Sequence, residues 1–225
     1  MKNFYMIILA VAAIGGGVLF FAMRGGTVAS EPVELGELEQ HELIDMAQPA
    51  GVYGDPDAPV TIMEFADYQC PKCKEFGLFV KPQVDAAYIR TGQARLVVHD
   101  FPLLGLHPHA FVAARAARCA GDQDRYFDYH DLVFETQEDW SPMGSAIGHF
   151  NDLADDLKLD TRAFRDCLES DRHADVVTAN MQLGLALGVG GTPTLLVHRG
   201  GPPVVRLGGS SFLDIRTAIE GEGEN

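Results

Sequence analysis

Basic side chains are scarce in this sequence. Its 225 residues include 17 lysines and arginines against 32 aspartates and glutamates, a formal net charge of −15 at pH 7. A chain this acidic repels the phosphate backbone, so we expect no nucleic acid partner. The hydrophobic fraction is 47%, which suffices for a buried core, and the charged fraction of 22% is too low for a largely disordered chain. The length suits one domain of ordinary size with an N-terminal extension.

Charge is absent from one long stretch near the N-terminus. Phe4 to Met23 is a run of twenty uncharged residues between Lys2 and Arg24. A helix of that length spans ~30 Å, the thickness of the hydrocarbon layer of a bilayer. Residues 1–24 are therefore expected to be a single transmembrane anchor. The alternative is a cleaved signal peptide, with residues 28–30 as the cleavage site. Either segment would place the remainder of the chain in the cell envelope, outside the cytoplasm on the periplasmic or extracellular face.

An acidic segment separates this N-terminal run from the rest of the chain. Residues 25–48 carry six acidic side chains together with glycine and proline. This composition predicts a solvated linker, with a short helix near Leu38–Met46. Residues 49–225 are expected to form the folded domain.

The folded domain begins with a Gly-, Asp- and Pro-rich segment, Gly51 to Pro59, that predicts a turn. The hydrophobic pattern of the chain after this turn predicts strands at Val60–Ala66, Ala94–His99, Thr194–His198 and Val204–Leu207. The first predicted helix runs from the pair Cys70 and Cys73 to about Arg90. Further helices are predicted at Ala110–Ala120, at Tyr126–Phe134, at two or more places within Leu153–Leu187, and at Phe212–Ile219. The order is β-α-β, a helical block at about 105–187, then β-β-α. That order predicts an α/β fold with a mixed sheet and helices on both faces.

Cysteine is also scarce, and its spacing is informative. The four cysteines are Cys70, Cys73, Cys119 and Cys167. The first two form a Cys-x-x-Cys, and there is no second one to complete a zinc site. The histidines that could complete such a site are His99, His107 and His109. Their spacing does not suit metal binding, so we expect no metal. An even number of cysteines outside the cytoplasm permits disulfides.

Cys70 and Cys73 lie where a predicted strand ends and a helix begins. The first turn of a helix presents unpaired N–H groups and the positive end of the helix dipole, which stabilise a thiolate. Pro71 suits the first helical position, and Lys72 adds a positive charge. We expect the pKa of Cys70 to lie well below the usual value near 8.5. Cys70 should be the exposed nucleophile, and Cys73, one turn further in, the resolving thiol.

Glu64 is the only acidic residue in the apolar run Val60 to Ala66. A carboxyl group on a buried strand has a raised pKa, because burial disfavours its charged form. Such a group near Cys73 could exchange a proton with it. Alternatively, the strand lies at the sheet edge and Glu64 faces solvent. Further along, Pro193 precedes a strand and is either tolerated there or forms a cis peptide bond in a tight loop.

Several motifs together resemble the DsbA-like thioredoxin-fold proteins. The stretch Glu64-Phe65-x-x-Tyr68-x-Cys70-Pro71-x-Cys73 resembles their active site, and Gly191-Thr192-Pro193-Thr194 resembles their cis-proline loop. Between these stretches, the segments that match the pattern of the family's helical insertion are Asp100–Leu103, His107-Pro108 and Tyr129–Phe134. The resemblance covers roughly residues 50 to 220 and preserves the order of the motifs.

This resemblance implies a thioredoxin-like fold with an inserted helical domain and a thiol–disulfide oxidoreductase activity. It implies that Cys70 attacks substrates, that Glu64 is the buried acid, and that Pro193 is cis. The Thr192–Pro193 segment would pair with an extended substrate backbone. The expected substrates are exported proteins with cysteines, and the expected partner is a membrane redox protein, DsbB-like or vitamin K epoxide reductase-like. The exchange needs no cofactor.

The direction of the reaction stays open at this point. The residues between the active-site cysteines are Pro71 and Lys72, where the best-known oxidase of the family has Pro-His. An oxidase of exported proteins is the first expectation, and a reductase or isomerase with the same site is the alternative. A non-catalytic chaperone that binds peptides is a third reading.

The remaining cysteines, Cys119 and Cys167, both fall in the helical block. We expect them to form a structural disulfide. The alternatives are a second redox pair or two buried thiols.

Overall fold

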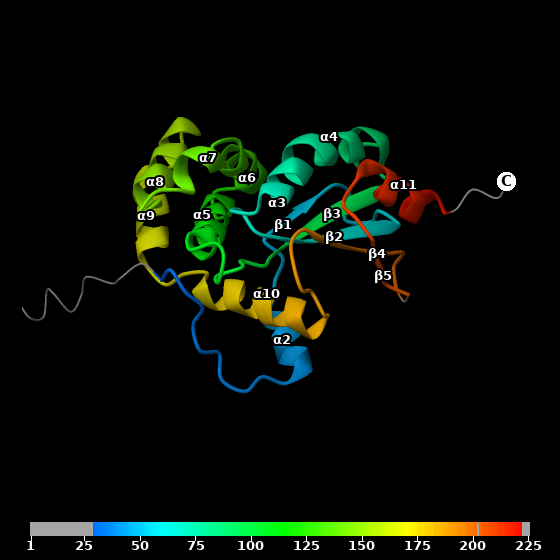
Figure 1. Cartoon of the computed structure of the whole chain (residues 1–225), viewed down its shortest axis with the longest axis horizontal. Helices are drawn as coiled ribbons and strands as arrows, with labels where there is room; N and C mark the ends of the chain where they lie inside the picture. Colours follow the sequence, from blue (N-terminus) through cyan, green and yellow to red (C-terminus); the bar gives the residue numbers. More distant parts are fainter. Residues whose placement is uncertain (1–28, 202, 222–225) are drawn as a thin grey trace, which may run out of the picture.

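A mixed five-stranded sheet lies at the centre of the part of the chain that the computed structural model describes, residues 29–201 and 203–221. The strands are β1 (Gly51–Tyr53), β2 (Val60–Ala66), β3 (Ala94–Asp100), β4 (Thr194–His198) and β5 (Val205–Arg206). Their order across the sheet is β1-β3-β2-β4-β5 (Figure 1). β2 and β3 are parallel, and the other neighbours are antiparallel. The four predicted strands are therefore confirmed.

Strand β1 corrects the prediction of a turn from Gly51 to Pro59. Gly51 pairs with Val98 of β3, and the Ala50 N–H donates to the Val98 carbonyl at 2.7 Å. A strand of three residues is too short to show the alternation of apolar and polar residues by which strands are predicted. Its pairing depends on the edge that β3 offers, which is a tertiary feature.

Helices cover both faces of the sheet, and a helical group stands beside it. The chain leaves β2 through α3 (Pro71–Glu75), the π-helical turn Phe76–Val80, α4 (Lys81–Val84) and the π-helical turn Asp85–Ile89. The remaining helices are α2 (Gln40–Met46), α5 (Ala110–Gly121), α6 (Tyr126–Glu135), α7 (Gln137–Trp140), α8 (Ile147–Asp156), α9 (Thr161–Glu169), α10 (Ala174–Ala186) and α11 (Phe212–Glu220). Figure 1 shows α3, α4 and α11 on one face, α10 and α2 on the other, and α5 to α9 beside the sheet.

The acidic segment before the domain contacts the helices through its backbone, while its six acidic side chains are exposed to solvent. The Val33 N–H donates to Thr178 Oγ1 at 3.1 Å, and the Arg115 guanidinium donates to the Ala29 carbonyl at 2.6 Å. The backbone of the acidic segment thus has hydrogen-bond partners on α10 and α5. The short helix expected near Leu38–Met46 is present as α2. The division of the chain at residues 24 and 48 stays a prediction.

The expected anchor or signal segment, residues 1–24, lies outside the described residues. Within residues 29–201 and 203–221, no helix has both the length and the apolar character needed to cross a membrane.

Cys119 and Cys167 form a disulfide, as expected, that joins α5 to α9. Both side chains are buried, and the Cα atoms are 5.9 Å apart with 48 residues of sequence separation. A cross-link over a loop of this length restricts the unfolded chain and stabilises the fold by roughly 4 kcal/mol in the chain-entropy model.

Replacing both cysteines, Cys119→Ala with Cys167→Ala, should therefore lower the free energy of unfolding by about 3–4 kcal/mol. Thiol exchange at Cys70 and Cys73 should persist, because the bridge lies in the helical group. Urea denaturation and an exchange assay on the same preparation measure the two effects. Loss of exchange in a folded double variant would place this bridge in the mechanism.

Candidate active site

Cys70 begins the helix that follows the central strand. β2 ends at Ala66, and Cys70 is the N-cap residue of α3 with an extended backbone (φ −75°, ψ 121°). Pro71 occupies the first helical turn, where its missing N–H leaves no bond unmade. The N–H groups of Cys73 and Lys74 both donate to the Cys70 carbonyl at 3.1 Å. The strand-to-helix position expected from the sequence is confirmed.

The two thiols differ in their access to solvent. Both are free, with relative exposures of 7% for Cys70 and 0% for Cys73. The Cys70 thiol donates to the Thr192 carbonyl at 3.3 Å, and Cys73 Sγ accepts from the Asp67 N–H at 3.5 Å. Cys70 is therefore the more accessible sulfur. It is less exposed than expected, because the Thr192 loop covers it.

The same two thiols differ strongly in acidity. The pKa of Cys70 is lowered to about 5, chiefly by a hydrogen bond from the Cys73 side chain. The Thr192 side chain and the backbone N–H groups of Cys73 and Lys72 also lower it, while burial acts in the opposite direction. Burial raises the pKa of Cys73 well above the usual value, and its bond to Cys70 and the nearby Glu64 carboxylate raise it further. The pair therefore combines one stabilised thiolate with one thiol that holds its proton.

The low pKa of Cys70 agrees with the sequence prediction, but its main cause is different. The Lys72 ammonium forms an ion pair with Glu75 at 2.7 Å, with both side chains largely exposed. A solvated ion pair of this kind contributes little. The Cys73 thiol is the principal cause instead, through a side-chain contact that the Cys-x-x-Cys spacing allows.

Glu64 lies in the middle of the sheet. Its strand pairs with β3 on one side and β4 on the other, where its partners are Val98 and Leu195. The side chain is fully buried, so the solvent-facing alternative is wrong. Burial raises the pKa of Glu64 to about 8. Neither carboxyl oxygen has a hydrogen-bond partner among the residues that the structure describes.

A buried lysine accompanies this carboxyl group and was not singled out from the sequence. Lys81, in α4, is 8% exposed and forms an ion pair with the Asp131 carboxylate of α6. Its positive charge opposes the effect of burial on the pKa of Glu64. His130 Nδ1 lies 2.8 Å from the same Asp131 oxygen. A buried lysine is usually paired with an opposite charge, and here Asp131 of the helical group supplies the counter-charge for Lys81.

The Thr192–Pro193 peptide bond is cis, as the resemblance implies. Thr192 lies against Cys70, and a pocket of about 480 Å³ adjoins it, with Lys72, Pro193 and Arg206 in its lining. The structure thus brings Thr192 and Pro193 beside the cysteine pair, although they are more than a hundred residues away in the sequence.

A set of polar side chains, of which the sequence analysis named only His107, holds the loop between β2 and α3. Asp67 accepts from the Gln69 N–H and from the Leu103 N–H, each at 2.7 Å, and His107 Nδ1 lies 2.8 Å from Asp67 Oδ2. The Gln137 amide donates to the carbonyls of Tyr68 and Cys70 at 2.7 and 3.1 Å. The sequence signals were the position of Asp67 directly after a buried strand and the His107-Pro108 motif.

The histidines considered as zinc ligands have other partners. His99 Nδ1 lies 2.6 Å from Asn180 Oδ1, and His109 Nε2 lies 2.6 Å from the Met143 carbonyl oxygen. In residues 29–201 and 203–221, the one group of three side chains with metal-binding spacing is Cys119, Cys167 and His173, and the disulfide occupies both sulfurs.

Comparison with known proteins agrees with this geometry. The family model described as thioredoxin matches residues 47–199. Disulfide bond formation protein D of Bacillus subtilis is 28% identical over 148 residues, which cover 65% of this chain and 67% of that protein. The crystal structure of oxidised BdbD from Bacillus subtilis is 27% identical with a TM-score of 0.67 and covers 77% of this chain and 91% of its own. Wolbachia pipientis alpha-DsbA1 is 25% identical with a TM-score of 0.67, covering 75% and 88%.

A second group of relatives is much longer. The Na(+)/H(+) antiporter NhaA 3 of Salinispora tropica is 32% identical over 147 residues, which cover 65% of this chain and 21% of the antiporter. The chain thus spans about a fifth of the length of that relative. In the chain itself, the matched family model, the fold and the Cys-x-x-Cys beside a cis-proline loop all indicate a thioredoxin-like protein. The chain belongs to the thioredoxin family, and its fold is similar to those of BdbD and alpha-DsbA1.

Proposed function

We propose that this protein oxidises cysteine pairs in exported proteins by dithiol–disulfide exchange at Cys70 and Cys73. The contrast in acidity between the two thiols carries the proposal, with the pKa of Cys70 at about 5 and that of Cys73 raised by burial. Stabilising the Cys70 thiolate favours the reduced form of the pair. The disulfide form is then a strong oxidant, which accepts electrons readily from substrate thiols.

The exchange proceeds through a mixed disulfide. A substrate thiolate attacks Cys70 Sγ, the Cys70–Cys73 bond breaks, and Cys73 leaves as a thiolate. Because this thiolate is buried, it takes a proton from the Glu64 carboxyl group, whose pKa of about 8 keeps it protonated at neutral pH. A second substrate thiolate attacks the substrate sulfur and releases Cys70 as a stable thiolate. Two electrons pass from the substrate to the enzyme.

Two neighbouring surfaces suit an unfolded substrate. The Thr192–Pro193 loop would pair with an extended substrate backbone next to Cys70. A groove of about 360 Å³ adjoins it through Gly190, and its lining is mostly apolar, with Leu106 75% and Leu185 64% exposed. Apolar side chains of a chain that has not yet folded would fit there, whereas a folded substrate hides them.

Repeated turnover needs an acceptor for the two electrons. We assign this role to a membrane redox partner, DsbB-like or vitamin K epoxide reductase-like, from the family resemblance. The uncharged run of residues 4–23 would hold the enzyme in the same membrane, with the catalytic domain outside the cytoplasm on the periplasmic or extracellular face. The relative from Bacillus subtilis bears the name disulfide bond formation protein D, which suits this assignment.

The reduction potential of the Cys70–Cys73 pair tests the direction of the reaction. Equilibration of the purified protein with glutathione buffers should give a value above about −150 mV, near the oxidising end of the family of thioredoxin folds. A value near about −270 mV, that of thioredoxin, would instead support the reductase or isomerase alternative. A pair that does not exchange with glutathione at all would leave only a peptide-binding chaperone.

A further inference from the structure

One residue outside the Cys-x-x-Cys contacts both of its cysteines. The backbone N–H of Asp67 donates to Cys73 Sγ at 3.5 Å, and the Asp67 carbonyl accepts from the Cys70 N–H at 3.1 Å. Asp67 follows directly after β2, and its side chain is fully buried. A buried carboxylate is costly unless its oxygens are hydrogen-bonded. The donors to these oxygens therefore show what holds Asp67 in place.

The segment that follows β3 holds the Asp67 carboxylate. Asp67 Oδ2 accepts from the Leu103 N–H at 2.7 Å and lies 2.8 Å from His107 Nδ1. The Leu103 carbonyl in turn accepts from the N–H groups of Leu106 and His107 at 2.8 and 2.9 Å. Residues 103–107 thus form a closed turn, and both ends of this turn are bonded to one carboxylate oxygen.

The same segment also orients the N–H group that faces Cys73. This N–H belongs to the peptide unit between Ala66 and Asp67, and the carbonyl of that unit accepts from the Phe101 N–H at 2.7 Å. In a trans peptide unit the C=O and the N–H point in opposite directions, so a partner on the carbonyl side fixes the direction of the N–H. Residues 101–107 therefore hold Asp67 both at its peptide unit and at its carboxylate.

A donor at this place matters when Cys73 becomes a leaving group. A substrate thiolate that attacks Cys70 Sγ breaks the Cys70–Cys73 bond, and the electron pair of this bond passes to the Cys73 sulfur. Hydrogen bonds to ionised acceptors are roughly twice as strong as those to neutral ones. The bond from Asp67 therefore strengthens as the charge develops, which lowers the barrier. Burial is the main influence on the pKa of Cys73 and raises it, while the Asp67 N–H lowers it.

We propose that Asp67 is a positioning residue for the resolving thiol. Its carboxylate, fixed by Leu103 and His107, holds its own backbone N–H on Cys73 Sγ while Cys73 leaves. The turn that fixes Asp67 also lines the apolar groove of about 360 Å³, so the groove and the resolving thiol share one support. The inference rests on the dithiol–disulfide exchange of the proposed function, in either direction of that exchange.

Asp67→Asn tests the role of the carboxylate. Asparagine has the same size, but its NH₂ group cannot accept the bonds that Oδ2 accepts. Reduced glutathione should open the oxidised Cys70–Cys73 pair about tenfold more slowly in this variant, less than the about 10²–10³ lost when a donor is removed outright, because the N–H is displaced rather than deleted. Acid quenching, alkylation and mass spectrometry of the intact protein measure the initial rate.

The Cys73→Ala background separates positioning of the leaving thiol from a general disturbance of the site. In that protein glutathione forms a mixed disulfide with Cys70, and dithiothreitol cleaves it without Cys73 as the leaving group. Adding Asp67→Asn should leave this cleavage within about twofold, because the N–H then has no thiolate to stabilise. A tenfold slower cleavage would assign Asp67 to the shape of the site and overturn the proposal. Equal opening rates in Asp67→Asn and the unchanged protein would overturn it as well, whereas an unchanged protein that glutathione does not open would overturn the proposed exchange itself.

His107 provides a second, milder test that does not depend on the folding of Asp67→Asn. His107→Asn keeps an N–H donor near the place of Nδ1, while His107→Leu removes it. Only the leucine variant should slow the opening by glutathione, by about threefold, because one of the bonds to the Asp67 carboxylate is lost. Equal opening rates in the two variants would contradict the proposed support of Asp67.

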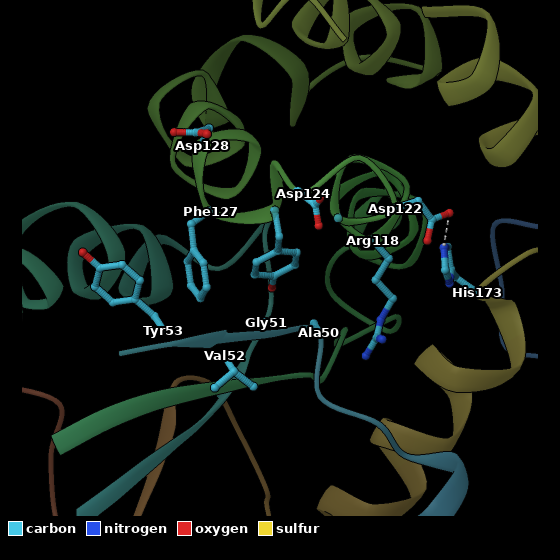
Figure 2. A pocket seen from close by; sticks show the side chains of 12 residues that line it. Ala50, Gly51, Val52, Tyr53, Arg118, Asp122, Asp124, Phe127, Asp128 and His173 are labelled. Atoms are coloured by element: carbon cyan, nitrogen blue, oxygen red, sulfur yellow. Dashed lines mark hydrogen bonds and ion pairs between the residues drawn. The ribbon is translucent and has the colours of Figure 1, made fainter. Parts of the chain in front are cut away.

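Asp122→Asn is the matched control. Asp122 also pairs with a histidine, His173, whose Nε2 lies 3.1 Å from Asp122 Oδ2 (Figure 2). Both residues line a cavity of about 620 Å³ between β1 and the helices α5 and α6, and its described lining includes neither Cys70 nor Cys73. The substitution removes the same charge and the same kind of contact, so the pair should open at the rate of the unchanged protein. A tenfold slower opening here would show that the loss of any one carboxylate suffices, and the positioning role of Asp67 would be overturned.

Discussion

Cys73→Ala should turn the enzyme into a covalent trap for its substrates. Substrate and enzyme are joined through Cys70 during exchange, and the complex is resolved when a second thiol attacks this bond. Without Cys73 the enzyme cannot release the substrate by its own internal thiol. Incubation with a peptide disulfide should accumulate an adduct in at least about tenfold excess over the unchanged protein. A non-reducing gel after acid quenching and alkylation measures it.

Cys70→Ala is the matched control for the trap and should give no adduct. Cys73 is fully buried, and burial keeps its thiol protonated, so it can neither reach a substrate nor attack one. Cys70 has the low pKa and is the more accessible of the two sulfurs, beside the Thr192 carbonyl. Adducts that form equally well through Cys73 would reverse the assigned roles. No adduct with either variant would argue against disulfide exchange altogether.

The sequence predicted the elements of this site because each is local. A strand of apolar residues, a Cys-x-x-Cys with proline at the first helical position, and a Gly-Thr-Pro-Thr before a strand are all patterns within ten residues. The family resemblance then supplied their arrangement, including the cis bond at Pro193. The even number of cysteines permitted a disulfide between Cys119 and Cys167, which was preferred over a second redox pair or two buried thiols, and the structure has the bond.

Other features depend on contacts between distant segments and left no local pattern. The ion pair of Lys81 with Asp131 joins residues 50 apart, and Gln137 reaches the carbonyl of Cys70 from α7. Strand β1 exists because β3 offers an edge, and glycine at its start is explained only by the ring of Tyr126. In each case, one polar or small residue has many plausible roles until its neighbour is known.

Glu64→Gln should change how stability depends on pH. The pKa of Glu64 is about 8 in the folded protein, against 4.5 for the ordinary group. Between these two values the folded protein holds a proton that the unfolded chain releases, so the free energy of unfolding falls as pH rises through this window. The loss is on the order of 5 kcal/mol and is complete above pH ~8. Glutamine does not titrate, so the variant should lack this component in urea denaturation curves at pH 5 and pH 8.5.

The same variant should exchange thiols slowly, although it is the more stable protein at high pH. Cys73 then loses the group that gives and takes its proton inside the fold. The rate of release of Cys73 in single-turnover experiments should fall by about 10²-fold, the lower end for losing a general acid–base group. Glu135→Gln, at an exposed position on α6, is the control and should alter neither rate nor pH dependence. A Glu64→Gln protein with the unchanged pH dependence of stability would show that Glu64 is ionised in the folded state. A protein with normal exchange rates would show that Cys73 obtains its proton elsewhere.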